Sequence, residues 1–249
     1  MVVASVVKQL ITTMNPSKVR LPACVLECWS LLESYADAFG RPELFNNITT
    51  GRTEMERLEK VTSFFLSQLK CMRAVSCVSK PYNPVHGELF ICSWPEPQFG
   101  SVHFVAEQIS HHPPVSSFYA ECKEANISLT STLFTKSGLM TSWLPPFLKA
   151  ITVDNVGQAT ISLDSHDEVY TMSYPTAVAT GILGSSPRLL LTGGVSITCS
   201  SHQGRVELTF EEESSVSGVV FGTKTGEQVA TEGTGEGWWR YSRRTGQRR

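Results

Sequence analysis

The spacing of apolar residues changes near Lys80, and this change constrains the fold more than any other feature of the sequence. Before Lys80, apolar side chains recur every three or four residues, as an amphipathic helix requires. After Lys80 they alternate with polar ones, as in strands that bury one face. Helices followed by a series of short strands indicate an α+β domain rather than a doubly wound one.

Three helical segments are predicted before the change. The first is a short amphipathic helix that ends near Asn15-Pro16. Its apolar side chains are Val3, Val6, Val7, Leu10 and Met14. The second extends from Leu31 to Phe39 and stops at Gly40, a residue that often ends helices. The third and most regular extends from Thr53 to about Val75.

The rest of the chain predicts an antiparallel meander that curls into a barrel or a sandwich. Its clearest alternating runs lie at 90–94, 102–106, 127–133, 169–173 and 206–210, with Gly and Pro clusters between them. Residues 214–237 are rich in Ser, Gly, Thr and Glu and have no long periodic run. We therefore expect one folded domain over residues 1–213 and a frayed or poorly ordered tail over residues 214–249.

The charge of the chain argues against a nucleic-acid-binding function. The chain has 21 Lys and Arg against 23 Asp and Glu, so bulk positive charge for nucleic-acid binding is lacking. The balance is uneven, because residues 238–249 carry five Arg and no acid. Two interpretations of this Arg-rich end remain open: contact with anionic lipid, or a solvated extension without a role.

Cysteine usage and the N-terminal sequence point to the cytosol. Seven Cys without a C-x-x-C pair fit buried thiols in a reducing compartment better than disulfides or a zinc site. The first residues lack a basic region and a cleavage site, so no signal peptide is predicted. We expect no metal and no cofactor.

Two motifs carry chemical information. The first is KPYNPVHGE at residues 80–88, a turn ahead of a strand that can hold Lys80, Asn83 and Glu88 in fixed directions. The second is EQISHHPP at residues 107–114. Partly protonated imidazoles of His111 and His112 suit a phosphate monoester, and a nearby lysine would add charge. The residues leave two alternatives open. The first motif could be an ordinary loop with an exposed lysine, and the second could be a His pair with its hydrogen bonds satisfied at a strand end.

Both motifs resemble signatures of the oxysterol-binding-protein-related family, in the order and at the spacing found there. Residues 21–33 and the segment 134–137 are similar to the family as well. The resemblance implies an incomplete antiparallel β-barrel around a hydrophobic lipid tunnel, with N-terminal helices and a lid of about residues 1–20. The inner face of that lid would carry Val3, Val6, Val7 and Leu10.

The family resemblance also implies a function. Members extract a sterol or another lipid, and many exchange it for phosphatidylinositol 4-phosphate at membrane contact sites. The phosphorylated headgroup would be bound by Lys80, Asn83, His111 and His112, with Glu88 nearby. This predicts a non-enzymatic lipid-transfer protein, cytoplasmic and peripheral at organelle membranes, with a sterol or phospholipid and phosphatidylinositol 4-phosphate as ligands.

The sequence departs from the family pattern at two places. His86 stands where an aliphatic residue is usual. Two interpretations are open: a third imidazole near the headgroup, or a residue that merely occupies a position at the rim of the site. Family domains continue well past the last strand recognised here, so the resemblance implies a C-terminally truncated domain with fewer headgroup contacts.

Two other classes of function are alternatives. A lipid sensor or scaffold would bind lipid without net transfer. A His-dependent hydrolase is disfavoured, because neither G-x-S-x-G nor H-E-x-x-H occurs in the sequence.

Overall fold

The computed structural model of the chain describes residues 9, 12, 26–73, 80–141, 148–181, 188–211, 216–222, 228–233 and 240–244. The predicted lid residues Val3, Val6, Val7 and Leu10 lie outside the described residues. In the described part of the chain, no helix has the length and apolar character that crossing a membrane requires.

The helix predicted from Leu31 to Phe39 is confirmed as α2 (Leu31–Ala36) and the short 3-10 helix η3 (Asp37–Phe39), and the helix predicted from Thr53 onward is confirmed as α4 (Glu54–Arg73). Between them the structure adds α3 (Pro42–Asn46) and the 3-10 helix η4 (Asn47–Thr50), which were not predicted. In α4 the side chains spaced at three or four residues are buried, namely Leu58, Val61, Phe65 and Leu69. This spacing places them on one helix face, which packs into the core.

The strands form one large antiparallel sheet and a small parallel pair. The small pair joins β1 (Leu26–Ser30) to β2 (Lys80–Tyr82). The large sheet contains β3 (Leu89–Trp94), β4 (Val102–Ser110), β5 (Val115–Cys122), β6 (Ile127–Thr141), β7 (Leu148–Leu163), β8 (Glu168–Ser173), β9 (Thr176–Thr180), β10 (Arg188–Cys199), β11 (Arg205–Phe210), β12 (Val216–Phe221), β13 (Gln228–Gly233) and β14 (Arg240–Arg244).

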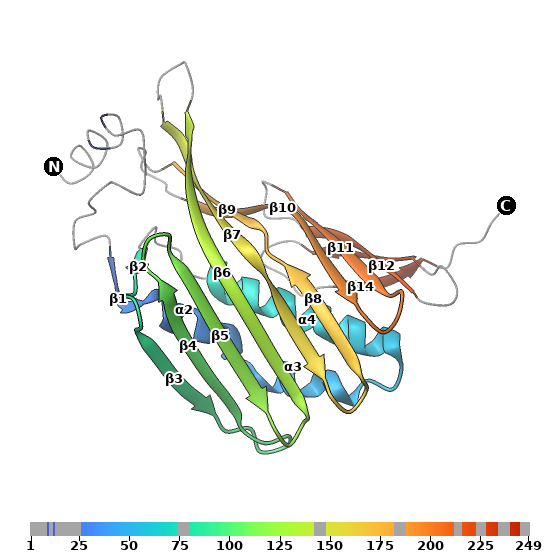
Figure 1. Ribbon diagram of the computed structural model, residues 1–249. Helices are drawn as coiled ribbons and strands as arrows, with labels where there is room; N and C mark the ends of the chain where they lie inside the picture. The colour runs from blue at the N-terminus through green and yellow to red at the C-terminus, as the bar shows by residue number, and fades with distance from the viewer. Residues whose placement is uncertain are drawn as a thin grey trace.

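The large sheet curves but stays open. Its strand order is β14-β13-β12-β11-β10-β8-β7-β6-β5-β4-β3, with β9 paired to β7 and β10. Within the described residues β3 and β14 form the two ends of this order and do not pair with each other (Figure 1). The predicted α+β class with an incomplete antiparallel barrel is therefore confirmed. The lipid tunnel inside it stays a prediction.

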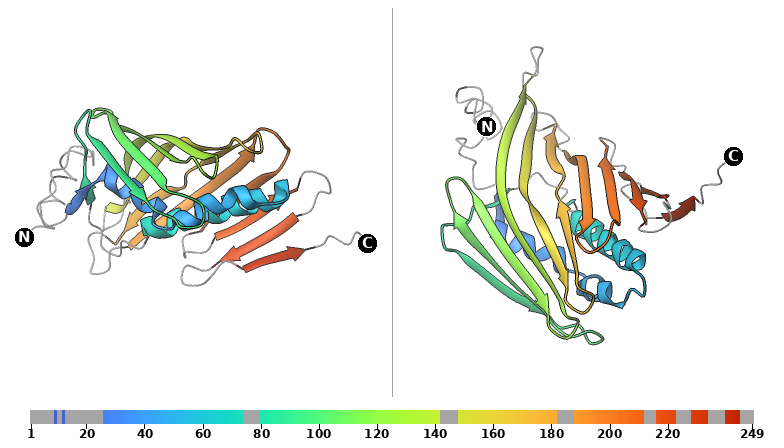
Figure 2. Two further views of the ribbon diagram at one scale, coloured as in Figure 1. Left: turned by 90° about the horizontal axis from the view of Figure 1, so that it is seen from below. Right: turned by 45° about the vertical axis from the view of Figure 1, so that its right-hand side comes forward.

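The core lies between the helices and one face of the sheet. Figure 2 shows α2, α3 and α4 lying together against that face. Along β4 the side chains alternate between buried and more exposed, so Val102, Phe104 and Ala106 face the helices. Phe39 is fully buried and contacts the rings of Phe45, Phe64, Trp94 and Phe104. Burial of this aromatic cluster fixes the helices to the sheet.

A buried ion pair adds a second attachment of α4 to the sheet. The guanidinium of Arg57 donates to both carboxylate oxygens of Glu168 on β8, at 2.7 and 2.5 Å. Arg57 also donates to the carbonyl of Gly51, and the Tyr170 hydroxyl donates to Glu168 at 2.7 Å. His202 lies beside the pair, with its Nε2 at 4.0 Å from Glu168. These contacts satisfy both buried charges, which would otherwise be costly to bury.

The predicted absence of regular structure after residue 213 is wrong. Strands β12 (Val216–Phe221), β13 (Gln228–Gly233) and β14 (Arg240–Arg244) continue the sheet. Antiparallel pairing depends on backbone hydrogen bonds, which a Ser- and Gly-rich sequence can make without an alternating pattern. Val216 and Val220 of β12 are buried, so its sparse apolar residues suffice to attach it to the core.

The long strands β7 and β10 were also missed by the sequence patterns. At Gly157 in β7, φ is +155° and a Cβ would lie 2.1 Å from the Thr132 carbonyl of β6. Only glycine permits this close approach of two strands. A glycine inside a strand interrupts the alternation that identifies strands in a sequence, which explains the omission.

Candidate functional site

The first motif forms β2 and a turn that is closed by its own hydrogen bonds. Glu88 donates its backbone N–H to the carbonyl of Val85 at 3.0 Å, and its carboxylate accepts from the backbone N–H of Val85 at 3.0 Å. Gly87 has φ of +80°, which favours glycine at this point of the turn. Glu88 therefore holds the turn in shape, so its carboxylate is engaged within the loop.

The second motif ends β4 and forms the turn 111–114 that leads to β5. Its second residue, Gln108, is fully buried. The Gln108 amide donates to the Ser110 carbonyl at 2.7 Å and accepts a hydrogen bond from the Ser116 hydroxyl. These bonds connect the two sides of the turn and fix its direction.

Backbone hydrogen bonds join the two motifs. Gly87 donates its N–H to the carbonyl of Gln108 at 2.8 Å, and Gln108 donates its own to the carbonyl of Glu88 at 3.0 Å. No role for Gln108 was predicted from the sequence. Its position inside the second motif was the available signal, but a buried glutamine cannot be distinguished from an exposed one in a single sequence.

The His pair lies directly beside the first motif. Nδ1 of His111 is 2.7 Å from the Pro84 carbonyl and 3.3 Å from the Asn83 amide nitrogen. The shorter contact places a proton on Nδ1, because a carbonyl oxygen can only accept. Nε2 of His111 is then the ring nitrogen that can meet a ligand.

The two histidines also contact each other. Their ring centroids are 4.5 Å apart in an edge-on arrangement. Adjacent side chains of an extended strand point to opposite faces, but the backbone turns at residues 111–114 and brings the two rings together. Asn83, His111 and His112 thus form one cluster, with His112 and Asn83 exposed and His111 half-buried.

The remaining predicted residues lie around this cluster. Lys80 is exposed on β2, three residues before Asn83. His86, the departure from the family pattern, is exposed on the same turn. The structure adds Lys136 to this region, because the preceding residue, Thr135, donates its N–H to Pro114 at 3.2 Å. Lys136 is exposed on β6, and the sequence did not single it out as a site residue.

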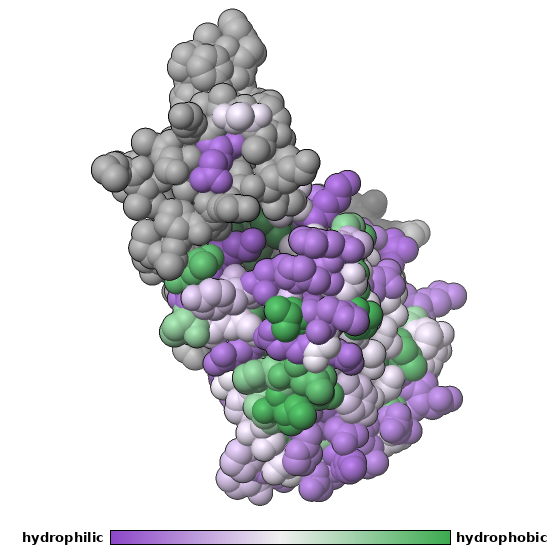
Figure 3. Space-filling model, turned by 60° about the vertical axis from the view of Figure 1, so that its left-hand side comes forward, coloured by the Kyte–Doolittle hydropathy of each residue, from purple (hydrophilic) through white to green (hydrophobic). Residues whose placement is uncertain are grey.

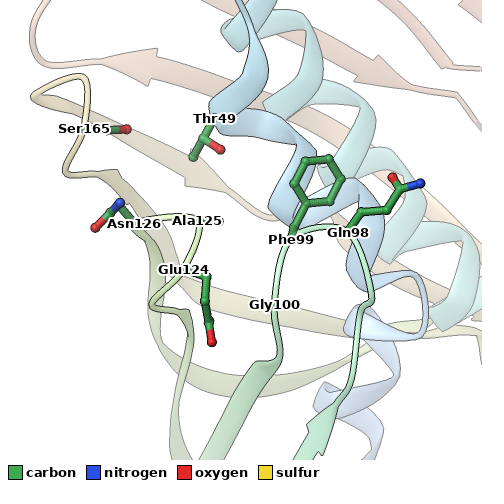
Figure 4. Close-up of a pocket in the computed structure, with 8 residues that line it drawn as sticks. All are labelled: Thr49, Gln98, Phe99, Gly100, Glu124, Ala125, Asn126 and Ser165. Carbon is green, nitrogen blue, oxygen red and sulfur yellow. The ribbon is translucent and has the colours of Figure 1, made fainter.

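A pocket at the other end of β4 does not contain these residues. It has a volume of about 500 Å³ and lies between loops of the sheet and η4 (Figure 4). Its lining residues are Thr49, Gln98, Phe99, Gly100, Glu124, Ala125, Asn126 and Ser165. The Glu124 carboxylate in the lining would repel an anion such as phosphate.

Solved structures share this fold. The ORD domain of Osh1 in complex with ergosterol aligns with a TM-score of 0.81 at 24% identity, over 97% of this chain and 56% of that one. The Osh3 ORD of Saccharomyces cerevisiae in complex with PI(4)P aligns with a TM-score of 0.79 at 17% identity, over 95% of this chain and 63% of that one.

Comparison of sequences identifies the family. Human oxysterol-binding protein-related protein 11 is 36% identical in an alignment of 242 positions that covers 84% of this chain and 31% of the relative. Oxysterol-binding protein 4 of Dictyostelium discoideum is 32% identical, over 83% of this chain and 43% of the relative. The chain thus spans less than half the length of these two relatives. The family model described as oxysterol-binding protein matches residues 3–244. The chain therefore belongs to the oxysterol-binding protein family.

Proposed function

We propose that this protein binds lipid and carries a sterol, phosphatidylinositol 4-phosphate or both between membranes, without catalysing a reaction. The observation that carries the proposal is the contact of His111 with Pro84 and Asn83, which joins the two family motifs into one polar cluster. Family membership supports lipid as the class of ligand.

The proposed headgroup site consists of Lys80, Asn83, His111 and His112. A phosphate monoester carries close to two negative charges and three acceptor oxygens. Lys80 supplies a positive charge, Asn83 an amide donor, and the two imidazoles supply donors when they are protonated. Glu88 takes part by holding the turn rather than by meeting the phosphate, since its carboxylate accepts the Val85 N–H.

Lipid transport needs a dry interior for the apolar part of the ligand. Covering acyl chains or a sterol skeleton gains about 25 cal/mol per Å² of apolar surface removed from water. An open sheet curved around one side of the molecule is a suitable frame for such an interior. The N-terminal lid over residues 1–20 belongs to the same proposal.

A vesicle assay tests this function. The protein should remove phosphatidylinositol 4-phosphate or a fluorescent sterol from donor vesicles and deliver it to acceptor vesicles. The double variant H111A/H112A should lose phosphoinositide extraction and keep sterol binding. If the wild-type chain extracts neither lipid, the proposal fails.

Two further outcomes have distinct meanings. Extraction without delivery would indicate the second candidate, a lipid sensor or scaffold. Equal loss of both ligands in H111A/H112A would indicate misfolding, which circular dichroism of the variant would reveal.

A further inference from the structure

Strand β3 lies at one end of the large sheet and, in the described part of the chain, pairs only with β4 (Figure 1). Among the described residues its other edge therefore has no strand beside it. Natural edge strands are usually protected by charged residues, prolines or bulges. The six residues of β3, LFICSW, include no charged residue and no proline, and the pairing with β4 has no bulge. An edge of this kind favours pairing with another strand.

The hydrogen bonds to β4 identify which residues of β3 face the open edge. Gln108 donates its N–H to the carbonyl of Glu88 at 3.0 Å, so Glu88 and Gln108 occupy a hydrogen-bonded position of the ladder. In an antiparallel pair, hydrogen-bonded and non-hydrogen-bonded positions alternate. The backbone N–H and C=O groups that point away from β4, toward the open edge, are therefore those of Leu89, Ile91 and Ser93.

Two of these residues also carry exposed apolar side chains on the outer face of the sheet. Leu89 and Ile91 are 58% and 72% exposed. Ile91 pairs with Val105 of β4, and Val105 pairs with Tyr119 of β5. These three side chains form a line that ends at the open edge, and we call them the apolar row. Figure 3, which turns the β3 side of the molecule forward, shows apolar residues grouped within a largely polar surface.

A second copy of β3 fits this edge in an antiparallel register that uses all the outward-facing residues. A two-fold axis at Ile91 would place Ile91 opposite Ile91 of the partner subunit and Leu89 opposite Ser93 of the partner subunit. Each of these residues has outward backbone groups, so every N–H meets a C=O, as a hydrogen-bonded position requires. The two apolar rows then join end to end across the axis. Such an interface is isologous, the arrangement found in most homodimers.

The charges on the outer face are compatible with this self-pairing. Leu89 lies beside Glu107 of β4, and Ser93 lies beside His103 of β4. In the two-fold register, the line of side chains that begins at Glu107 continues to His103 of the partner subunit, so two carboxylates are not placed opposite each other. Leu89–Trp94 itself is uncharged, so β3 has no side chain with which an acidic or basic peptide would form an ion pair. Charge thus favours a second copy of this strand over a charged peptide.

We propose that this chain forms a symmetric homodimer in which the two β3 edges pair about a two-fold axis at Ile91, so that the two large sheets continue into each other. The proposal goes beyond lipid binding and does not depend on it. One pair of short strands buries less surface than a standard protein–protein interface, so we expect a weak dimer with a Kd on the order of 10–100 µM.

Sedimentation equilibrium of the full chain, from about 5 to about 500 µM, tests for this dimer. I91D places two like charges opposite each other at the axis and should weaken dimerisation at least about tenfold. V156D is the matched control, because Val156 is 53% exposed on β7, which lies inside the strand order rather than at its end. Its Kd should stay within about twofold of the wild type. A wild type that stays monomeric throughout, or equal weakening by V156D, would overturn the proposal.

S93P separates strand pairing from contact through the apolar row. The Ser93 N–H points away from β4, so proline removes a hydrogen bond of the dimer and none from the sheet of the monomer. S93P should therefore weaken dimerisation, and circular dichroism checks that the variant is folded. Dimerisation of folded S93P with wild-type affinity, together with its loss in I91D, would overturn strand pairing in favour of contact between the two outer faces.

Amide hydrogen exchange of the wild type tests the register without any substitution. The N–H groups of Leu89, Ile91 and Ser93 should exchange at least about tenfold more slowly at protein concentrations above the Kd than below it, because they are bonded only in the dimer. The amides of Phe90 and Cys92 bond to β4 in the monomer, so their exchange should change far less. Unchanged exchange of the three outward amides in a dimeric sample would overturn β3 as the interface.

Discussion

Two polar clusters in this protein contain histidine, and they differ in burial. The first joins Arg57, Glu168, Tyr170 and His202 between α4 and the sheet, where the Arg57 and Glu168 side chains are 9% and 4% exposed. The second joins Asn83, His111 and His112 at the motif turns, where Asn83 and His112 are exposed. In the first cluster the protein's own groups satisfy the charges. In the second cluster, side-chain hydrogen-bond donors remain exposed to solvent.

Similar side chains can serve stability or binding, according to what surrounds them. Removing a member of a satisfied buried cluster leaves an unpaired charge in the interior, which is costly. Removing a member of an exposed cluster leaves a group that water can solvate. Stability should therefore respond mainly to the first cluster, and ligand binding to the second.

The largest expected effect comes from Glu168→Gln. The substitution leaves the buried Arg57 guanidinium without its counter-charge, so the free energy of unfolding should fall by about 3–5 kcal/mol. Urea denaturation measures this loss. A loss of less than about 1 kcal/mol in the free energy of unfolding would show that the buried pair does not hold α4 to the sheet.

Tyr170→Phe should have a smaller effect of about 2 kcal/mol. It removes one hydrogen bond to the Glu168 carboxylate and retains the ring. Tyr174→Phe is the matched control, because its hydroxyl contacts the neutral Ser131 hydroxyl at 3.2 Å and should be worth about 1 kcal/mol. Equal losses in the two variants would argue against a special contribution of the charged partner.

The pH dependence of stability should separate the clusters further. Burial tends to raise the pKa of Glu168, but hydrogen bonds from Arg57 and Tyr170 and the nearby positive charges outweigh it, so the pKa is lowered from 4.5. Stability from this carboxylate is thus fully present above pH 4.5 and is lost as the pH falls through the lower folded-state pKa.

Acid titration of the unfolding midpoint, comparing wild type with E168Q, measures this contribution. The difference in stability between the two proteins should shrink below pH 4.5. A difference that stays constant down to the acid transition would contradict the assigned pKa shift.

The smallest effects are expected from a pair of histidine substitutions. His202→Ala removes a buried ring that accepts the Gly204 N–H at 3.0 Å, and should cost about 1 kcal/mol of stability. His112→Ala should change stability by less than about 0.5 kcal/mol, because the ring is exposed. Thermal unfolding compares them. A greater loss in H112A would mean that the His cluster supports the fold rather than a ligand.

Local patterns predicted the parts of the fold that repeat regularly. The apolar spacing of Leu58, Val61, Phe65 and Leu69 predicted α4, and alternation at Val102, Phe104 and Ala106 predicted β4. The strands after residue 213 were missed because their pairing uses backbone groups, which every residue has. Strand β7 was missed for a related reason. Gly157 interrupts the alternation of side chains and lets the backbones of β6 and β7 approach closely.

The sequence by itself determined the α+β class and the two motifs, because each depends on residue types at short spacing. Only the tertiary structure decided which residues meet. Arg57 and Glu168 are 111 residues apart, and Asn83 and His111 are 28 apart. Pairings at such separations follow from sheet register and helix packing. The same packing buries Gln108 and exposes Ile109, two neighbours whose different surroundings no local pattern reveals.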